Sequence, residues 1–336
     1  MSVTISGTAG VTFNDASNQT TAATGFGFKN RLLNGAMQIA QRATSATITA
    51  GSTIAAGYST VDRWYVYCTG ANVTAAQVAG TGATKSRLQI TGAASVTAVG
   101  IGQRIEQLNS YDLAGSTATL SLDISNSLLT TVTWTAYYAN TADTFGTLAS
   151  PTRTQIATGT FTVTSTLTNY STNISIPAAA TTGVEIVLTV GAQTSGTWVV
   201  GNIQLEKGST ATSFDYRPYG TELALCQRYA WTIKGSSQQV CNGFVRLAAN
   251  FIGSIQFPVT MRTTAALTVP NSAGYFNVSW GSSDTSMATL SVAGGGTAIT
   301  ENNALLQATL SAATVGQGGV LALNNASSYV LFTAEL

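Results

Sequence analysis

The stretch Gly201–Trp231, GNIQLEKGSTATSFDYRPYGTELALCQRYAW, brings together an alternating strand, a turn, a proline and a short helix-like run. The strand has the two-residue period of a half-buried β-strand. Its apolar face is expected to carry Val199, Ile203 and Leu205, and its polar face Asn202, Gln204 and Glu206. Lys-Gly-Ser is typical of a strand end. The chain before this point is predicted to be one β domain.

The chain is expected to leave this domain as a stiff arm, because Pro218 fixes its own φ and favours an extended Arg217. A short helix is predicted directly afterwards, with Thr221 as its cap and Glu222 near its positive N-terminus. The residues expected at the domain junction are Tyr216, Arg217, Pro218, Tyr219, Leu223, Cys226, Tyr229 and Trp231.

Upstream of this arm, short strands recur between clusters of Gly, Ser, Asn and Thr. The candidates are Arg63–Cys68, Arg87–Ile90, Gly102–Leu108, Ala118–Ile124, Thr131–Ala139, Gly159–Thr164, Thr172–Ile176, Val184–Val190 and Thr197–Glu206. Strands at such spacing indicate an all-β sandwich, and about nine of them over roughly 190 residues is the size of a jelly roll.

Beyond Trp231 the pattern becomes β again, with YFNVSW at Tyr275–Trp280 and a closing apolar strand in SSYVLFTAEL. We therefore predict a jelly-roll-like β-sandwich, a short helix and a second, smaller β domain. The expected bounds are 1–28 for an N-terminal segment, 29–219 for the sandwich, 220–233 for the linker helix and 234–336 for the distal domain.

The composition limits the classes of function. Only 8% of the 336 residues are charged, against about 25% in an ordinary soluble domain. The net charge of +1 provides no basic field, so nucleic acid is not an expected partner. No run of 18 apolar residues predicts a membrane span. The start, MSVTISGTAG, has no basic or apolar region typical of a signal peptide.

Catalytic and metal chemistry are not indicated by the residue types present. There is no histidine, and Cys68, Cys226 and Cys241 lack metal-ligand spacing. The spacing leaves a Cys226–Cys241 disulfide open. The acidic residues are dispersed. Asp62 adjoins Arg63, and Glu106 lies two residues after Arg104; these four residues are interpreted as structural ion partners. We expect no catalytic residue, no cofactor and no metal site; calcium is conceivable in a jelly roll, but no dense Asp/Asn loop marks a site.

Aromatic residues are the candidates for ligand binding. Trp64 and Trp134 share the parity of apolar neighbours and are expected in the core. Tyr65, Tyr67 and Tyr137 have the opposite parity, which favours a sugar-stacking platform or a contact between chains. In the distal domain Tyr275 and Trp280 have opposite parities, so one of them is expected to be exposed as a further glycan contact.

Four blocks in order resemble the tail-fibre proteins of tailed bacteriophages. They are KNRLLNGAMQIAQRATS at Lys29–Ser45, VDRWYVY at Val61–Tyr67, GQRIEQL at Gly102–Leu108 and QLEKGSTATSFDYRPYGTELALCQRYAW at Gln204–Trp231. They span roughly the middle two thirds of the chain, and such a match is more specific than any single motif. Family members usually have Trp-Gln-Arg-Gly in the first block, so Ala40 and Ala43 depart from the pattern and weaken any role assigned to that loop.

The resemblance implies a homotrimeric fibre on the virion surface, assembled in the host cytoplasm, where free thiols are expected. Its likeness to fibre proteins also includes VTFNDASNQTTAA at Val11–Ala23, which resembles a short repeat near their N-termini. The first 28 residues are then expected to attach to other virion proteins or to form a stalk. The residues assigned to this attachment are Val11, Phe13, Phe26 and Phe28. A flexible tail is the alternative.

The function implied is a structural virion protein that attaches the phage to host-surface glycans. Its junction block is then expected to pack with its symmetry mates. Three alternatives stay open: a head or neck fibre or capsid decoration protein, a polysaccharide-degrading or de-esterifying tail enzyme, and a spacer or assembly collar that binds no receptor.

Overall fold

The computed structural model describes residues 28–51, 57–81, 84–147, 149–270, 274–280, 283–287, 289–310 and 313–336, together with three short N-terminal strands. These strands are β1 (Thr4–Ser6), β2 (Gly10–Thr12) and β3 (Asn18–Gln19), and they form an antiparallel sheet. Val11 lies in β2, whereas Phe13 and Phe26 lie outside the described residues.

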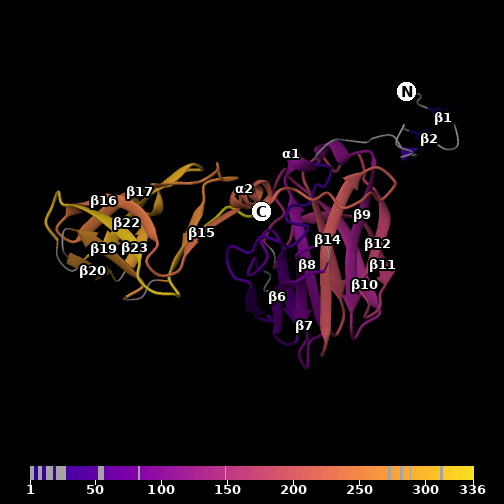
Figure 1. The fold of residues 1–336 in the computed structure, drawn as a ribbon, viewed down its shortest axis with the longest axis horizontal. Helices are drawn as coiled ribbons and strands as arrows, with labels where there is room; N and C mark the ends of the chain where they lie inside the picture. The colour runs from indigo at the N-terminus through magenta and orange to yellow at the C-terminus, as the bar shows by residue number, and fades with distance from the viewer. Residues whose placement is uncertain are drawn as a thin grey trace.

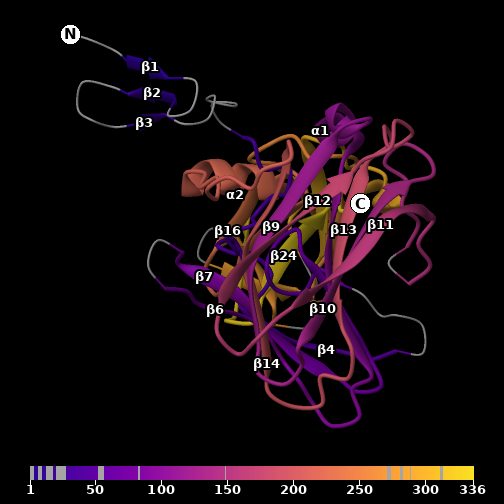
Figure 2. The same cartoon turned by 90° about the vertical axis from the view of Figure 1, so that its right-hand side faces the viewer.

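The sandwich consists of two antiparallel sheets (Figures 1 and 2). The five-stranded sheet has the order β11 (Arg153–Thr162), β10 (Thr131–Ala139), β13 (Val184–Val190), β8 (Ala98–Ile105) and β5 (Tyr65–Thr69). The six-stranded sheet has the order β12 (Thr168–Ser175), β9 (Thr117–Asn126), β14 (Thr197–Lys207), β7 (Ser86–Thr91), β6 (Val73–Ala79) and β4 (Ser45–Ile48).

The pairing of these strands defines a jelly roll. β10 pairs with β11, β9 with β12, β8 with β13 and β7 with β14, so that each pair encloses the previous one along the chain. Alternate pairs fall in opposite sheets. This nesting is the arrangement of a jelly roll, and it confirms the predicted fold class. β4, β5 and β6 extend the two sheets at their edges.

Most predicted strands match observed ones, and the differences have local causes. Thr131–Ala139 and Val184–Val190 are observed with the predicted bounds. The strand predicted to reach Leu108 ends at Ile105, because the chain turns into the short helices α1 (Gln107–Ser110) and η1 (Tyr111–Leu113). Strands β4 and β6 were not predicted, since SATI and VTAAQVA contain few large apolar residues.

The expected face of Val199 was wrong because β14 contains a bulge. Trp198 and Val200 are buried, and Ile203 and Leu205 are buried after them, so the inward positions skip one residue. The register shifts between Gly201 and Gln204, and Asn202 has a φ of 48°. An extra residue of this kind reverses the alternation, which leaves Val199 half-buried on the outer side.

The sandwich core contains the tryptophans that parity placed there. Trp64 is 0% exposed and Trp134 7% exposed, and both belong to one continuous apolar cluster with Trp198. All three cysteines are buried and free, as expected, so Cys226 and Cys241 form no disulfide. Among the described residues, no helix has the length and apolarity needed to cross a bilayer.

The distal domain has its own core between two antiparallel sheets. The three-stranded sheet has the order β15 (Ala230–Lys234), β24 (Tyr329–Thr333) and β18 (Ala266–Thr268). The larger sheet has the order β20 (Ser283–Met287), β19 (Phe276–Trp280), β23 (Gly318–Leu323), β16 (Gln239–Leu247), β17 (Asn250–Gln256), β22 (Asn303–Thr309) and β21 (Thr289–Val292), with the short helix η2 (Gly294–Gly296) after β21.

The predicted linker helix is α2 (Tyr219–Gln227), between the two domains (Figure 1). It begins at Tyr219, one residue before the predicted bound of 220. Pro218 is its N-cap, so the expectation that Thr221 caps it was wrong. The first distal strand already starts at Ala230 and pairs with the closing strand β24. Residues 230–233 therefore belong to the distal domain rather than to the helix.

The end of the chain returns to the sandwich. Glu335 accepts hydrogen bonds from Arg42 and Arg63, and Arg104 Nη1 donates to the Leu336 oxygen at 2.9 Å. Arg262 of the distal domain donates to the carbonyls of Ala334 and Glu335. Arginines of both domains thus hold the last three residues at the junction.

Candidate functional site

Three tyrosines lie on the outer face of the five-stranded sheet, away from the core. Tyr65 and Tyr67 lie on β5 and Tyr137 on β10, at positions that alternate with buried core residues, as their parity predicted. The rings of Tyr65 and Tyr67 lie side by side, with centroids 6.5 Å apart and planes 25° from parallel. Two adjacent aromatic rings therefore cover this part of the face.

Two glycines on β8 let these rings lie across the sheet. Strand pairing sets Gly100 beside Tyr67 and Gly102 beside Tyr65. A Cβ on Gly100 would lie 2.1 Å from Cζ of Tyr67, and one on Gly102 would lie 2.2 Å from the Tyr65 hydroxyl. Both distances are far below van der Waals contact. Any side chain at positions 100 and 102 would force the rings up from the sheet.

A buried carboxylate anchors the same face. Glu185 is 0% exposed and lies on β13 between Arg104 and Tyr137 of the neighbouring strands. It accepts hydrogen bonds from the Tyr65 hydroxyl at 2.7 Å, from Arg104 Nε at 3.0 Å and from Arg153 Nη1. A buried carboxylate with charged and hydroxyl donors holds its neighbours in one geometry.

Arg153 connects this anchor to Tyr137. Its guanidinium carbon lies 3.8 Å from the centroid of the Tyr137 ring, a cation–π contact. Only Nη1 of Arg153 hydrogen-bonds within the described part of the chain, so its other N–H groups can reach a ligand. We call Tyr67, Tyr137 and Arg153, with Tyr65 as a buried floor, the tyrosine platform.

The platform combines flat rings with hydroxyl groups. Burial raises the pKa of Tyr67 to about 12, partly opposed by the charge of Arg153, so its hydroxyl stays protonated at neutral pH. The exposed Gln155 and Thr158 lie on β11 next to Tyr137 and Thr135 of β10. This arrangement can stack against the apolar face of a sugar ring and hydrogen-bond its hydroxyl groups.

Not every predicted contact residue is available on this face. Tyr65 is only 2% exposed, so the expectation that its ring meets a ligand was wrong, since Glu185 and Tyr58 pack around it. Tyr275 and Trp280 lie in the distal domain, far along the chain from the platform. Both are half-buried against the distal core, so neither is the exposed residue that their parities predicted.

The predicted junction residues divide between the two domains and α2. The Arg217 side chain is buried and donates to Glu222 of α2 at 3.2 Å. The Tyr229 hydroxyl donates to Glu106, and Arg63 lies 3.5 Å from the Tyr229 ring centroid. Glu106 also accepts hydrogen bonds from Arg228. Burial raises the pKa of Glu106, but the hydrogen bonds from Arg228 and Tyr229 outweigh burial and hold this pKa below its ordinary value.

The other junction residues are less central. Cys226 is fully buried, Leu223 is half-buried, and Pro218, Tyr216 and Tyr219 are exposed. Trp231 packs on Phe257 and Phe332 and so belongs to the distal domain.

Phe28, assigned to virion attachment, lies at the same end of the sandwich as α2. Its exposed ring is 5.5 Å from the Arg217 guanidinium. Both line a hollow of about 240 Å³ that Tyr229 also borders.

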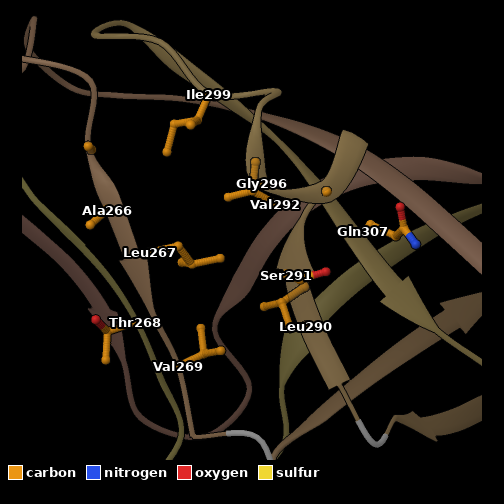
Figure 3. Close-up of a pocket in the computed structure, with 12 residues that line it drawn as sticks. Ala266, Leu267, Thr268, Val269, Leu290, Ser291, Val292, Gly296, Ile299 and Gln307 are labelled. Carbon is orange, nitrogen blue, oxygen red and sulfur yellow. The ribbon is translucent and has the colours of Figure 1, made fainter.

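A larger cavity of about 660 Å³ lies in the distal domain (Figure 3). It separates β18 from β21, and Leu267, Val269 and Ile299 point into it. None of its lining residues is aromatic or charged. It therefore lacks the aromatic rings on which sugars stack, and its polar side chains are those of Thr268, Ser291 and Gln307. Nowhere in the described ranges do three or more His, Cys, Asp or Glu residues gather as metal ligands.

Sequence reasoning missed the residues that support the platform. Gly100 and Gly102 occur in the string VGIGQR with a two-residue spacing, which could have indicated space for large residues on the neighbouring strand. Glu185 is a lone acidic residue in a β-branched strand, and such a residue is rarely buried without a partner. Its partners come from β5, β8 and β11, which no local pattern connects.

No family model and no curated protein sequence matches this chain. Similar solved structures include a CBM4 module, at 14% identity and a TM-score of 0.34, covering 52% of this chain and 98% of that one. The CBM22-1 xylan-binding domain from Paenibacillus barcinonensis Xyn10C is 12% identical, with a TM-score of 0.27, over 44% and 87%. The enzymatically active domain of bacteriophage CBA120 tailspike protein 4 is 15% identical, with a TM-score of 0.32, over 54% of this chain and 22% of that one.

Proposed function

We propose that this protein is an adhesion fibre subunit of a tailed bacteriophage and that its sandwich binds host-surface glycans through the tyrosine platform. The observation that carries the proposal is the pair Gly100 and Gly102, which let Tyr67 and Tyr65 lie across an outer sheet face. Stability alone does not require aromatic rings in such a place, whereas sugar stacking does.

The geometry favours an extended glycan over a single sugar. Tyr67 and Tyr137 lie on β5 and β10, with two strands between them, and strands are spaced about 4.8 Å apart. Since the Tyr67 ring reaches over β8, a chain of a few sugar units can contact both rings. Arg153 then lies beside Tyr137, and its N–H groups that make no hydrogen bond to the described residues can donate to sugar hydroxyls.

The fibre part of the proposal is supported by the four ordered sequence blocks. In a trimer, each weak platform contact is repeated, and avidity can exceed single-site affinity by about 10²–10⁴. Light scattering on the full chain is expected to give three times the chain mass of 34.5 kDa. A monomer in solution would instead favour a decoration protein that gains its valency on the particle.

The test of the platform is binding of the full chain to host envelope polysaccharide, measured by glycan array and calorimetry. Tyr67→Ala and Tyr137→Ala are each expected to weaken binding about tenfold, since a stacked ring face buries roughly 50 Å² of apolar surface. Tyr111→Ala is the matched control, because Tyr111 is exposed on η1, outside the sheet. Thermal unfolding of each variant checks that it is folded.

Two results would contradict the proposal. Binding by Tyr67→Ala and Tyr137→Ala at wild-type affinity would show that the platform is not the site. Failure of the wild-type protein to bind any host polysaccharide would reject glycan attachment altogether. Release of reducing ends from the polysaccharide would favour the enzyme alternative.

A further inference from the structure

A cleft of about 350 Å³ lies between the two domains. The sandwich lines it with Arg42, Ala43 and Ser59. The distal domain lines it with Thr232, Lys234, Ala326, Ser327, Tyr329 and Leu331. Its size falls in the range of about 300–1,000 Å³ typical of small-ligand sites, which favour domain interfaces.

Two cations border this cleft, and none of its lining residues is acidic. The Arg42 side chain is only 9% exposed; its Nη2 pairs with Glu335 at 2.9 Å. Its Nη1 is buried without a hydrogen bond, and the nearest acid oxygen, Asp62 Oδ1, is 3.7 Å away. On the other wall, the exposed Lys234 side chain has no hydrogen bond or ion pair within the described residues.

The cleft also contains polar groups that make no hydrogen bond. Thr232 Oγ1 is buried and makes no hydrogen bond, and the same is true of Arg42 Nη1. Ser59 and Ser327 add further hydroxyl groups to the lining. Since buried polar groups in proteins are nearly always hydrogen-bonded, each such exception indicates a missing partner. Arg42 Nη1 has the Asp62 carboxylate as its ion partner, whereas the Thr232 hydroxyl has no partner within the described residues and indicates a ligand with an acceptor.

We propose that this cleft binds the carboxylate-bearing sugar unit of an acidic glycan. The exposed Lys234 ammonium donates to the carboxylate, which gains a charge-assisted hydrogen bond, and Arg42 supplies a second positive charge on the opposite wall. The hydroxyl groups of Thr232, Ser59 and Ser327 pair with the sugar hydroxyls. The ligand class rests on the proposed glycan-binding function, but the site is separate from the tyrosine platform.

The test compares two ligands that differ only in the acid group, methyl glucuronide and methyl glucoside. Saturation-transfer NMR titrations of the full chain are expected to show at least tenfold tighter binding of the glucuronide. Lys234→Ala is expected to weaken glucuronide binding about three- to tenfold, because an exposed charge contributes a modest pairing energy. Thr232→Val is expected to weaken it to a smaller extent.

The matched control is Lys85→Ala, which removes the same charge at an exposed position of the sandwich outside the cleft. It is expected to leave glucuronide binding unchanged. Equal affinity for the two glycosides, or wild-type affinity in both cleft variants, would overturn the proposal. If inorganic phosphate binds as tightly and competes fully, the cleft is a general anion site, which also overturns the sugar assignment.

The outcome can be separated from that of the platform. Tyr67→Ala is expected to keep wild-type affinity for methyl glucuronide. If it also keeps full affinity for host polysaccharide while Lys234→Ala loses the glucuronide, the platform is rejected and the cleft stands. If Tyr67→Ala loses polysaccharide binding and the wild-type protein ignores the glucuronide, the cleft is rejected and the platform stands.

Discussion

The two outer faces of the sandwich differ in kind, although they belong to one jelly roll and draw on one Thr-rich composition. On the six-stranded sheet, the outward positions of β9 and β12 carry Thr, Ser and Asn, with one ion pair between Arg87 and Asp123 at 3.1 Å. On the five-stranded sheet, the outward positions carry tyrosines, two glycines and the buried Glu185.

The difference teaches which features the fold needs and which it does not. The outward positions of β12, at the edge of the six-stranded sheet, carry short polar side chains that are exposed. Both faces contain a buried charge, Arg87 on the six-stranded sheet and Glu185 on the five-stranded sheet. The five-stranded face has in addition aromatic rings packed over two glycines, which weaken a strand. Such features are retained where a surface serves another purpose, and this reasoning supports a binding role for the platform.

The largest difference between the faces is expected on removal of their carboxylates. Glu185→Ala is expected to lower the free energy of unfolding by about 3–5 kcal/mol, because it leaves Arg104 and Arg153 facing a buried site without a counter-charge. Asp123→Ala on the opposite face is expected to cost less, about 1–3 kcal/mol, since Asp123 pairs with one buried arginine, Arg87, whereas Glu185 pairs with two. Urea denaturation measures both, and equal losses would show that the two faces are equivalent.

A smaller effect is expected from adding a methyl group beneath the rings. Gly102→Ala is expected to cost about 1–3 kcal/mol, because the buried Tyr65 is held by Glu185 and cannot move aside. Gly100→Ala is expected to cost less stability but to reduce glycan affinity, since the half-buried Tyr67 can tilt away. Gly191→Ala is the control, because a Cβ there meets nothing within 4 Å. Equal losses of stability in all three variants would contradict the role assigned to Gly100 and Gly102.

The smallest effect is expected in the alkaline pH dependence of stability. Burial raises the Tyr67 pKa from an ordinary value of 10.0 to about 12, so the folded protein holds this proton more tightly than the unfolded chain. The resulting stability is complete below about pH 10 and is lost as the pH rises toward 12. Tyr67→Phe is therefore expected to lose less stability than wild type over this interval. Identical pH profiles in urea denaturation would show that Tyr67 is not shielded.

The sequence pattern predicted the sandwich well where apolar and polar residues alternate. Thr131–Ala139 and Val184–Val190 contain apolar residues at every second position, so their strands were found with correct bounds. Strand β6 was missed because Ala and Thr dominate it. The resemblance to tail-fibre proteins contributed the trimer and the host receptor, and both stay predictions.

Parity also placed Tyr65, Tyr67 and Tyr137 on one face, although it could not rank their exposure. Tyr65 and Tyr67 have the same parity on the same strand, yet one is buried and the other half-exposed. Exposure depends on what packs around a side chain. Glu185 and Tyr58 approach Tyr65 from distant parts of the sequence, and no local pattern contains that information.

The sequence by itself determined the β class and the side of each regular strand on which a residue lies. Both follow from the pleat, a property of neighbouring residues. The tertiary structure alone decided the bulge at Asn202, the meeting of Glu185 with Arg104 and Arg153, and the cleft between Arg42 and Lys234. Each of these joins residues far apart in the chain, and such pairings depend on the packing of the whole molecule.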